Sequence, residues 1–293
     1  MLSRRVNELL GQLPQLQEWG KEIASAVHQL VLDGGPPARN VADLLHGTWL
    51  GHPLHPVLTD LVVGAWTLAA FFDLASLVED EGQATMEKTA DMLTTLGNAA
   101  AIPTAISGMA DFSTIPNPAA ADALVHSLLN STGLALYLGS AEARRQGNRD
   151  SALALSTAGL AVLFAGAWMG GHLVYNKKVG VNHADIPAKP TEWTPVLEAE
   201  ALQAGEPVRV TAEENPVLLY RQGEQIYAIG AVCPHAGAPL ENGEFDGHHV
   251  QCPWHDSVFD LRDGCVVHGP STFPTPNYEA RIRGGQVEVR IAD

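Results

Sequence analysis

Four residues that could bind metal lie in two short arms near the C-terminal end of the chain. The first arm is Cys233-Pro234-His235-Ala236-Gly237, and the second is Cys252-Pro253-Trp254-His255. Each arm offers one thiolate and one imidazole. Two Cys and two His can bind one zinc ion, but a zinc finger pairs Cys with Cys and His with His along the chain. The mixed arms therefore favour an iron–sulfur cluster, with the thiolates on one iron and the imidazoles on the other.

The two arms also resemble a known family. Cys-Pro-His-x-Gly-x-Pro-Leu, which begins at Cys233, and Cys-Pro-Trp-His, which begins at Cys252, resemble the signature of Rieske domains, in particular the ferredoxin-like ones. The resemblance implies a [2Fe–2S] cluster. It places Cys233 and Cys252 on the inner iron, and His235 and His255 on the outer iron, as metal ligands.

The sequence departs from the respiratory-chain version of this family at two pairs of positions. Ala238 and Trp254 stand where those proteins have two further Cys, so we expect no disulfide between the arms. Those proteins also use a Ser and a Tyr to hydrogen-bond the sulfurs. Here Ser257 is present, but the second position is Phe259. Because fewer donors stabilise the reduced cluster less, we expect a low-potential centre, nearer to the ferredoxins than to the quinol oxidases. The remaining Cys265 is expected to be a buried apolar thiol.

The elements around the arms are predicted to be β-strands. Short β-branched or aromatic runs at 208–210, 217–220, 226–229, 280–283 and 287–290 alternate with glycines, which is typical of an antiparallel β domain. We place this Rieske domain at 197–293, after a Pro-containing linker at 177–196. The loop Gly269-Pro270-Ser271 is expected to cover the cluster from the side.

Charge restricts the partners of the chain. Residues 191–293 hold six Arg, no Lys and sixteen Asp or Glu, and the whole chain carries a net charge of −16. Nucleic-acid binding needs a basic footprint, so no nucleic-acid partner is expected. An acidic surface instead favours a basic redox partner protein.

Four apolar segments precede the linker, at roughly 54–78, 92–112, 122–141 and 152–175. Each is close to the ~20 residues that a helix needs to cross a bilayer. The fourth has no charged residue, which disfavours the alternative of a soluble helical bundle. The prediction is a multidomain α + β protein with a four-helix transmembrane domain at 45–176. Gly51-His52-Pro53-Leu54-His55-Pro56, with Gly170-Gly171-His172, resembles an uncharacterised family of small four-helix membrane proteins that has a topology but no settled activity.

The first 44 residues are predicted to be an amphipathic helical region. Apolar residues recur at three- and four-residue steps from Leu9 to Leu30, and this helix could lie on the membrane surface or, as we favour, pack on the rest of the protein. Arg4-Arg5 is not followed by an apolar region of the kind that an export signal needs. We therefore expect a multi-pass protein of a prokaryotic plasma membrane, with the Rieske domain in the cytoplasm.

Four histidines mark the ends of the apolar segments. His52 and His55 begin the first, His126 begins the third and His172 ends the fourth, so four crossings would place all of them at one membrane face. Imidazoles from different helices suit haem or metal. There are two alternatives. The histidines could form a quinone or proton site, or they could simply end the helices where the membrane meets water. Haem would be of the b type, because the sequence has no Cys-x-x-Cys-His for covalent attachment.

These features predict a membrane-anchored Rieske protein that transfers one electron at a time, with a relay to a haem or metal centre as one interpretation. The alternatives are a quinol- or haem-linked membrane oxidoreductase and a non-catalytic redox sensor whose helices serve as an anchor. Oxygenase chemistry is not expected, because it needs a mononuclear iron on a large substrate domain.

Overall fold

The computed structural model describes residues 2–78, 81–184, 186 and 188–292. It divides into two compact units. One consists of Met1–Asp33 and Leu54–Val179, and the other of Gly34–Pro53 and Gly180–Asp293. The first is helical and the second is mainly antiparallel β, which confirms the predicted α + β class. Residues 79, 80, 185 and 187 of the predicted connections lie outside the described residues.

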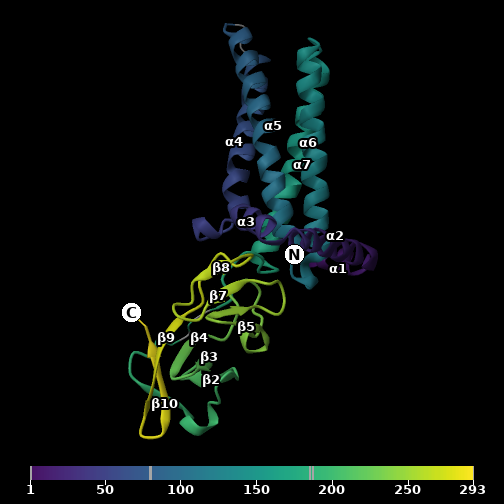
Figure 1. Cartoon of the computed structure of the whole chain (residues 1–293). Helices are drawn as coiled ribbons and strands as arrows, with labels where there is room; N and C mark the ends of the chain where they lie inside the picture. The colour runs from purple at the N-terminus through teal and green to yellow at the C-terminus, as the bar shows by residue number, and fades with distance from the viewer. Residues whose placement is uncertain (1, 79–80, 185, 187, 293) are drawn as a thin grey trace. The chain divides into compact units, whose positions relative to one another are not determined.

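The helical unit is built on four long helices that run up and down as two hairpins, α4 with α5 and α6 with α7 (Figure 1). These follow the four predicted apolar segments and extend the second and third. The prediction of four does not include three earlier helices, so the described residues before the β domain form seven α-helices. The helices of this unit are α1 (Leu2–Gly11), α2 (Pro14–Asp33), α4 (Leu54–Ser76), α5 (Gln83–Ser113), α6 (Ala120–Arg145) and α7 (Arg149–Tyr175).

Small residues let the long helices approach closely. The indole of Trp66 in α4 lies against Gly97 of α5, where an added Cβ would stand 2.3 Å from the ring. Trp66 also stacks on Tyr137 of α6, with ring centroids 3.9 Å apart. The two rings form the centre of the bundle core, because Trp66 is 2% exposed and Tyr137 is 0% exposed.

A buried ionic cluster joins all four long helices near the α4–α5 and α6–α7 turns. Arg144 of α6 donates to Asp73 of α4 at 3.0 Å and to Asp91 of α5 at 2.7 Å. Arg149 of α7 also donates to Asp73, at 3.1 Å, and to Asp91. The Arg144 side chain is only 3% exposed. Sequence reasoning missed this cluster, because its members are spread over 76 positions.

The amphipathic N-terminal helix α2 packs across the end of the bundle where α6 begins (Figure 1). Gly20 makes this possible, since a Cβ there would stand 2.5 Å from the carbonyl oxygen of Ala120. The Gln17 side chain accepts a hydrogen bond from the N–H of Ala121 at 3.0 Å and so caps α6. The favoured packing interpretation is therefore observed. Trp19 and Ile23 stay exposed, and contact of this face with lipid remains a prediction.

Two helices of the described chain, α4 and α7, are long and apolar enough to cross a membrane by length and composition. Helices α5 and α6 do not meet this criterion, so the notion that they also cross stays a prediction.

The β unit contains two antiparallel sheets. The larger has the order β1-β10-β9-β4-β3-β2, and the smaller has the order β5-β6-β7-β8. All five predicted runs lie in strands of the larger sheet. The strands are β1 (Thr194–Glu198), β2 (Val208–Ala212), β3 (Asn215–Gln222), β4 (Gln225–Gly230), β5 (Glu244–Asp246), β6 (His249–Gln251), β7 (Val258–Asp260), β8 (Val266–His268), β9 (Asn277–Arg283) and β10 (Gln286–Ile291).

Helix α3 (Gly35–His46) and the short η1 (Thr48–Leu50) belong to the β unit. Asp43 of α3 accepts hydrogen bonds from the backbone N–H of Gly269 at 2.7 Å and from His268 at 2.7 Å. A segment that precedes the long helices in sequence therefore packs on the loop after β8. The predicted domain boundaries at 44/45 and 176/177 do not anticipate this grouping, and the boundaries themselves stay a prediction.

Candidate iron–sulfur site

The two Cys/His arms have the same backbone construction. In the first, which lies between β4 and β5, the N–H of Cys233 donates to the carbonyl of Ala238 at 2.8 Å. In the second, between β6 and β7, the N–H of Cys252 donates to the carbonyl of Ser257 at 2.8 Å. Each Cys carbonyl accepts from the N–H four residues later, and that residue has a positive φ: 83° at Gly237 and 63° at Asp256. Each arm is therefore a closed loop that holds its Cys at a fixed position.

The arms bring their four metal-binding side chains together. The thiols of Cys233 and Cys252 hydrogen-bond to each other. The rings of His235 and His255 stand edge to face, with centroids 4.9 Å apart and an interplanar angle of 87°. The Nδ1 atom of each ring is buried. The two thiols therefore form one pair and the two imidazoles another.

The pKa values of the two arm cysteines are shifted in opposite directions, and the shift favours thiolate at Cys252. The hydrogen bond from Cys233 lowers the pKa of Cys252 to about 7, and the backbone N–H groups of Trp254 and His255 act in the same direction against burial. The same hydrogen bond and burial raise the pKa of Cys233, although the N–H groups of His235 and Ala236 oppose this. Backbone donors aimed at both sulfurs suit thiolate ligands and lower the energy of negative charge there.

The donor set fits a two-iron cluster better than a single ion. In the part of the chain that the structure describes, no group of three or more His, Cys, Asp or Glu could hold one metal ion. A single zinc ion needs four converging ligands. A [2Fe–2S] cluster with mixed ligands needs only two per iron, which is the pairing that the arms provide.

Comparison with known proteins agrees with this geometry. The Rieske [2Fe-2S] domain family matches residues 192–279. The anthranilate 1,2-dioxygenase ferredoxin subunit of Burkholderia cepacia is 33% identical over 100 residues, which are 34% of this chain and 93% of that subunit. The chain belongs to the Rieske [2Fe-2S] family. Its Rieske domain binds a [2Fe–2S] cluster.

Another ferredoxin and a solved ferredoxin structure are also similar to this chain, and a second family matches its helical part. Ferredoxin CarAc of Metapseudomonas resinovorans is 34% identical over 98 residues, 33% of this chain and 92% of that protein. The solved ferredoxin of carbazole 1,9a-dioxygenase from Nocardioides aromaticivorans IC177 is 28% identical and covers 34% of this chain and 98% of its own, with a TM-score of 0.33. Residues 51–183 match a family of predicted membrane proteins, DUF2231.

The Rieske domain has no disulfide among its described cysteines. Ala238 is fully buried, whereas Trp254, beside His255, is 54% exposed. The expectation for Cys265 is wrong, because this residue is exposed. It lies in the turn before β8, where its backbone N–H donates to the Asp263 carboxylate at 2.9 Å. The Cys265 side chain is therefore not part of the apolar core.

The loop after β8 is tied to the second arm. The N–H of Ser271 donates to Ser257 Oγ at 2.9 Å. Phe259 is fully buried in the same core as both arm cysteines. Two segments from outside the predicted domain also contact the arms: Arg39 of α3 donates to the carbonyl of Asp256 at 3.4 Å, and the N–H of His183 donates to the carbonyl of Pro234 at 2.9 Å. No sequence pattern signals these contacts.

The four helix-end histidines do not form one cluster. In the helical unit, His55 and His126 are neighbours, with ring centroids 6.2 Å apart. His172 instead contacts Asp122 and Ser3, at 3.3 and 2.9 Å. His52 lies in the other unit, is exposed, and contacts the carbonyl of Pro53. Only two of the four histidines are therefore brought together.

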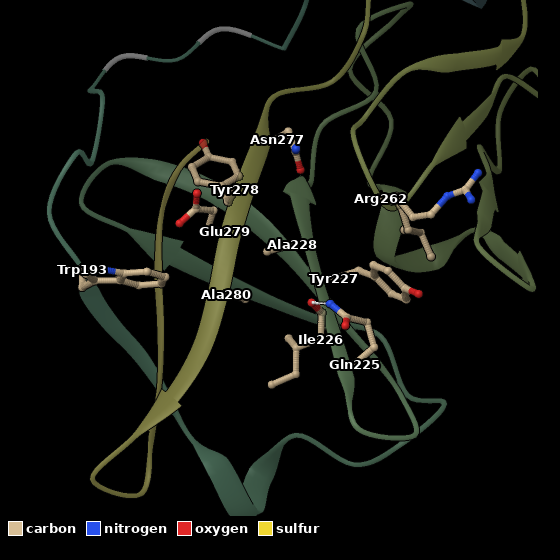
Figure 2. A pocket seen from close by; sticks show the side chains of 11 residues that line it. Trp193, Gln225, Ile226, Tyr227, Ala228, Arg262, Asn277, Tyr278, Glu279 and Ala280 are labelled. Atoms are coloured by element: carbon tan, nitrogen blue, oxygen red, sulfur yellow. Dashed lines mark hydrogen bonds between the residues drawn. The ribbon is translucent and has the colours of Figure 1, made fainter. Parts of the chain in front are cut away.

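The β unit also has a groove of about 620 Å³ between β4 and β9, where these strands separate beyond the Ala228–Tyr278 pair. Figure 2 shows Trp193 at one side of this groove and Tyr227 and Arg262 at the other. None of the proposed cluster ligands lines it. The groove is therefore separate from the cluster site.

Proposed function

We propose that this chain is a membrane-anchored electron carrier in which Cys233, His235, Cys252 and His255 hold the [2Fe–2S] cluster. The observation that carries this proposal is the convergence of the two mixed arms as a thiol pair and an imidazole pair. The cluster supplies one-electron redox chemistry. The protein contributes the closed arms that fix the ligands and the backbone N–H groups directed at the sulfurs.

The ferredoxin relatives suggest the type of partner. The Burkholderia cepacia protein is the ferredoxin subunit of a dioxygenase. By analogy, we propose that this domain exchanges electrons with a partner protein that is itself an oxidoreductase. Because the domain is acidic, we propose a basic docking face on that partner. An exchange rate that falls with ionic strength would support this, and a rate independent of salt would contradict it.

The anchoring helices are proposed to lie in a prokaryotic plasma membrane as a multi-pass domain, with the Rieske domain in the cytoplasm. The family match over residues 51–183 and the two apolar helices support a membrane location. A reporter that is active only in the periplasm, fused to the C-terminus, tests the orientation. It should be inactive, and an active reporter would reverse the topology.

The test of electron transfer uses the full chain in detergent, reduced and then mixed with an excess of oxidised cytochrome c. One electron per cluster should be delivered. The Cys252→Ser variant should deliver none. If the wild type and the variant transferred equal numbers of electrons, the cluster would not be the electron donor.

A quinol- or haem-linked oxidoreductase is the second candidate. The contact between His55 and His126 inside the helical unit favours it. An anchor that only tethers the domain needs no such pair.

A further inference from the structure

Two histidines of the helical unit, from different helix hairpins, lie close together. His55 lies in the first turn of α4, and His126 lies in the second turn of α6. Their ring centroids are 6.2 Å apart, and the ring planes are almost perpendicular at 83°. Both side chains are half-buried.

Each ring is oriented by a backbone carbonyl of the neighbouring helix. His55 Nδ1 lies 2.9 Å from the carbonyl oxygen of Thr104 in α5, and His126 Nδ1 lies 2.9 Å from that of Gly166 in α7. A carbonyl oxygen can only accept, so each Nδ1 carries the proton and each Nε2 keeps its lone pair. Histidines that bind metal commonly donate their second ring N–H in this way.

Glycines make room for both rings. A Cβ at Gly108 of α5 would stand 2.7 Å from Cε1 of His55, and one at Gly170 of α7 would stand 3.1 Å from Cε1 of His126. The amide nitrogen of Asn130 lies 3.2 Å from Nδ1 and 3.3 Å from Nε2 of His126, but it is closer, at 2.8 Å, to the carbonyl oxygen of His126. The Asn130 amide is therefore held by the backbone of α6.

The spacing suits two axial ligands of one metal. Two imidazoles bound through Nε2, with metal–nitrogen bonds of about 2.0 Å, place their ring centroids roughly 6 Å apart. Among the residues that the structure describes, no third His, Cys, Asp or Glu completes a metal site here. A porphyrin supplies four nitrogens in one plane and leaves its iron two axial positions, which two imidazoles can fill.

We propose that His55 and His126 are the axial ligands of a b-type haem held between the α4–α5 and α6–α7 hairpins. The haem iron would take up one electron, passing from ferric to ferrous. The donor would be the reduced Rieske cluster, in which one ferrous iron becomes ferric, so this step rests on the proposed function. Binding of haem by the two histidines does not depend on that step.

The test uses the full chain, produced in haem-supplied cells and purified in detergent. The wild type should contain one haem per chain, with the optical and EPR spectra of six-coordinate low-spin iron. His55→Gln and His126→Gln should each reduce haem content at least tenfold or convert it to a high-spin form. The matched control His52→Gln, in the other unit, should keep the wild-type spectrum.

A cavity variant separates ligation from folding. His126→Gly should lose the low-spin spectrum and recover it with added imidazole. Failure of imidazole to restore the spectrum would contradict axial ligation by His126. The EPR signal of the reduced [2Fe–2S] cluster, recorded on the same samples, should stay unchanged throughout.

Wild-type protein with a full cluster signal and no haem would overturn the haem proposal and leave the electron-carrier function standing. If a quinone co-purified with the wild type and was lost in His55→Gln and His126→Gln, the two histidines would form a quinone site and the haem proposal would be wrong. Loss of the cluster signal in the wild type would instead contradict the proposed function.

Discussion

The cluster arms and the histidine pair of the helical unit are built in opposite ways. Each arm closes on itself through hydrogen bonds between residues four and five positions apart. The histidine pair is assembled from four helices, with His55 bound to a carbonyl 49 positions away and His126 to one 40 positions away. A local loop can hold its ligand when distant parts of the chain change, whereas a site between helices depends on every packing contact of the bundle. Substitutions in the arms and in the bundle test that difference.

Loss of one arm ligand should have the largest effect. Cys252→Ser should reduce bound iron and acid-labile sulfide at least tenfold, because a hydroxyl is a poor substitute for a buried thiolate ligand. Cys265→Ser, which changes an exposed thiol, is the matched control and should keep full cluster content. Equal cluster content in both variants would contradict the proposed ligand set.

The buried ionic cluster should dominate the stability of the helical unit. Arg144→Met leaves Asp73 buried without its main partner, and breaking a buried pair in this way costs about 3–5 kcal/mol. Arg145→Met, which removes an exposed pair with Glu142, should cost less than about 1 kcal/mol. Chemical unfolding in detergent measures both. The EPR signal of the [2Fe–2S] cluster should not change in either variant. A loss of that signal in Arg144→Met would show that the Cys/His arms depend on the packing of the helical unit.

The sequence alone singled out the two arms, because their four metal-binding side chains lie within two short motifs; their role as cluster ligands stays a prediction. It also predicted the long helices from their apolar runs, and the five main strands. It did not predict the contact of Asp43 with Gly269, which joins positions 226 apart. Nor could it show that His172 would turn to Asp122 instead of His126. Such contacts depend on tertiary packing, which leaves no periodic pattern in the sequence.

Asp43 tests whether the β unit depends on the segment before the long helices. Asp43→Ala removes an acceptor from the Gly269 N–H and from His268, so the β unit should lose about 1–3 kcal/mol of stability. Glu224→Ala, at an exposed turn, should change stability by about 0.5 kcal/mol or less. Thermal unfolding of both full-length variants decides this. If the two variants unfold alike, helix α3 does not stabilise the β unit.

The cluster potential should respond to a donor within the arm core. Phe259→Tyr places a hydroxyl in the core that holds both cysteines. One added hydrogen bond to the reduced cluster should raise the midpoint potential by roughly 50 mV. Phe245→Tyr, at the edge of that core, is the control and should shift it less. Redox titrations followed by EPR give both values, and a wild-type midpoint well above +150 mV would contradict the low-potential assignment.

The smallest expected effect is on acid stability. The Arg262 guanidinium lowers the pKa of Asp260 to about 2. A lowered pKa in the folded state means that the pair stabilises the fold above the unfolded value near 4 and loses this contribution as the pH falls towards 2. Asp260→Asn should therefore flatten the pH dependence of stability between about pH 4 and 2. If the slope of stability against pH were unchanged in that window, the Asp260–Arg262 pair would not contribute to acid unfolding.

EPR on the reduced, detergent-solubilised chain with ¹⁵N-labelled histidine tests whether the two arms hold a [2Fe–2S] cluster with two histidine ligands. We expect a paramagnetic signal coupled to two histidine nitrogens, and His235→Ala or His255→Ala should abolish that coupled signal. The oxidised form of the same preparation reports any low-spin ferric haem. An EPR-silent protein that contains zinc, or a cluster signal without histidine coupling, would contradict the account.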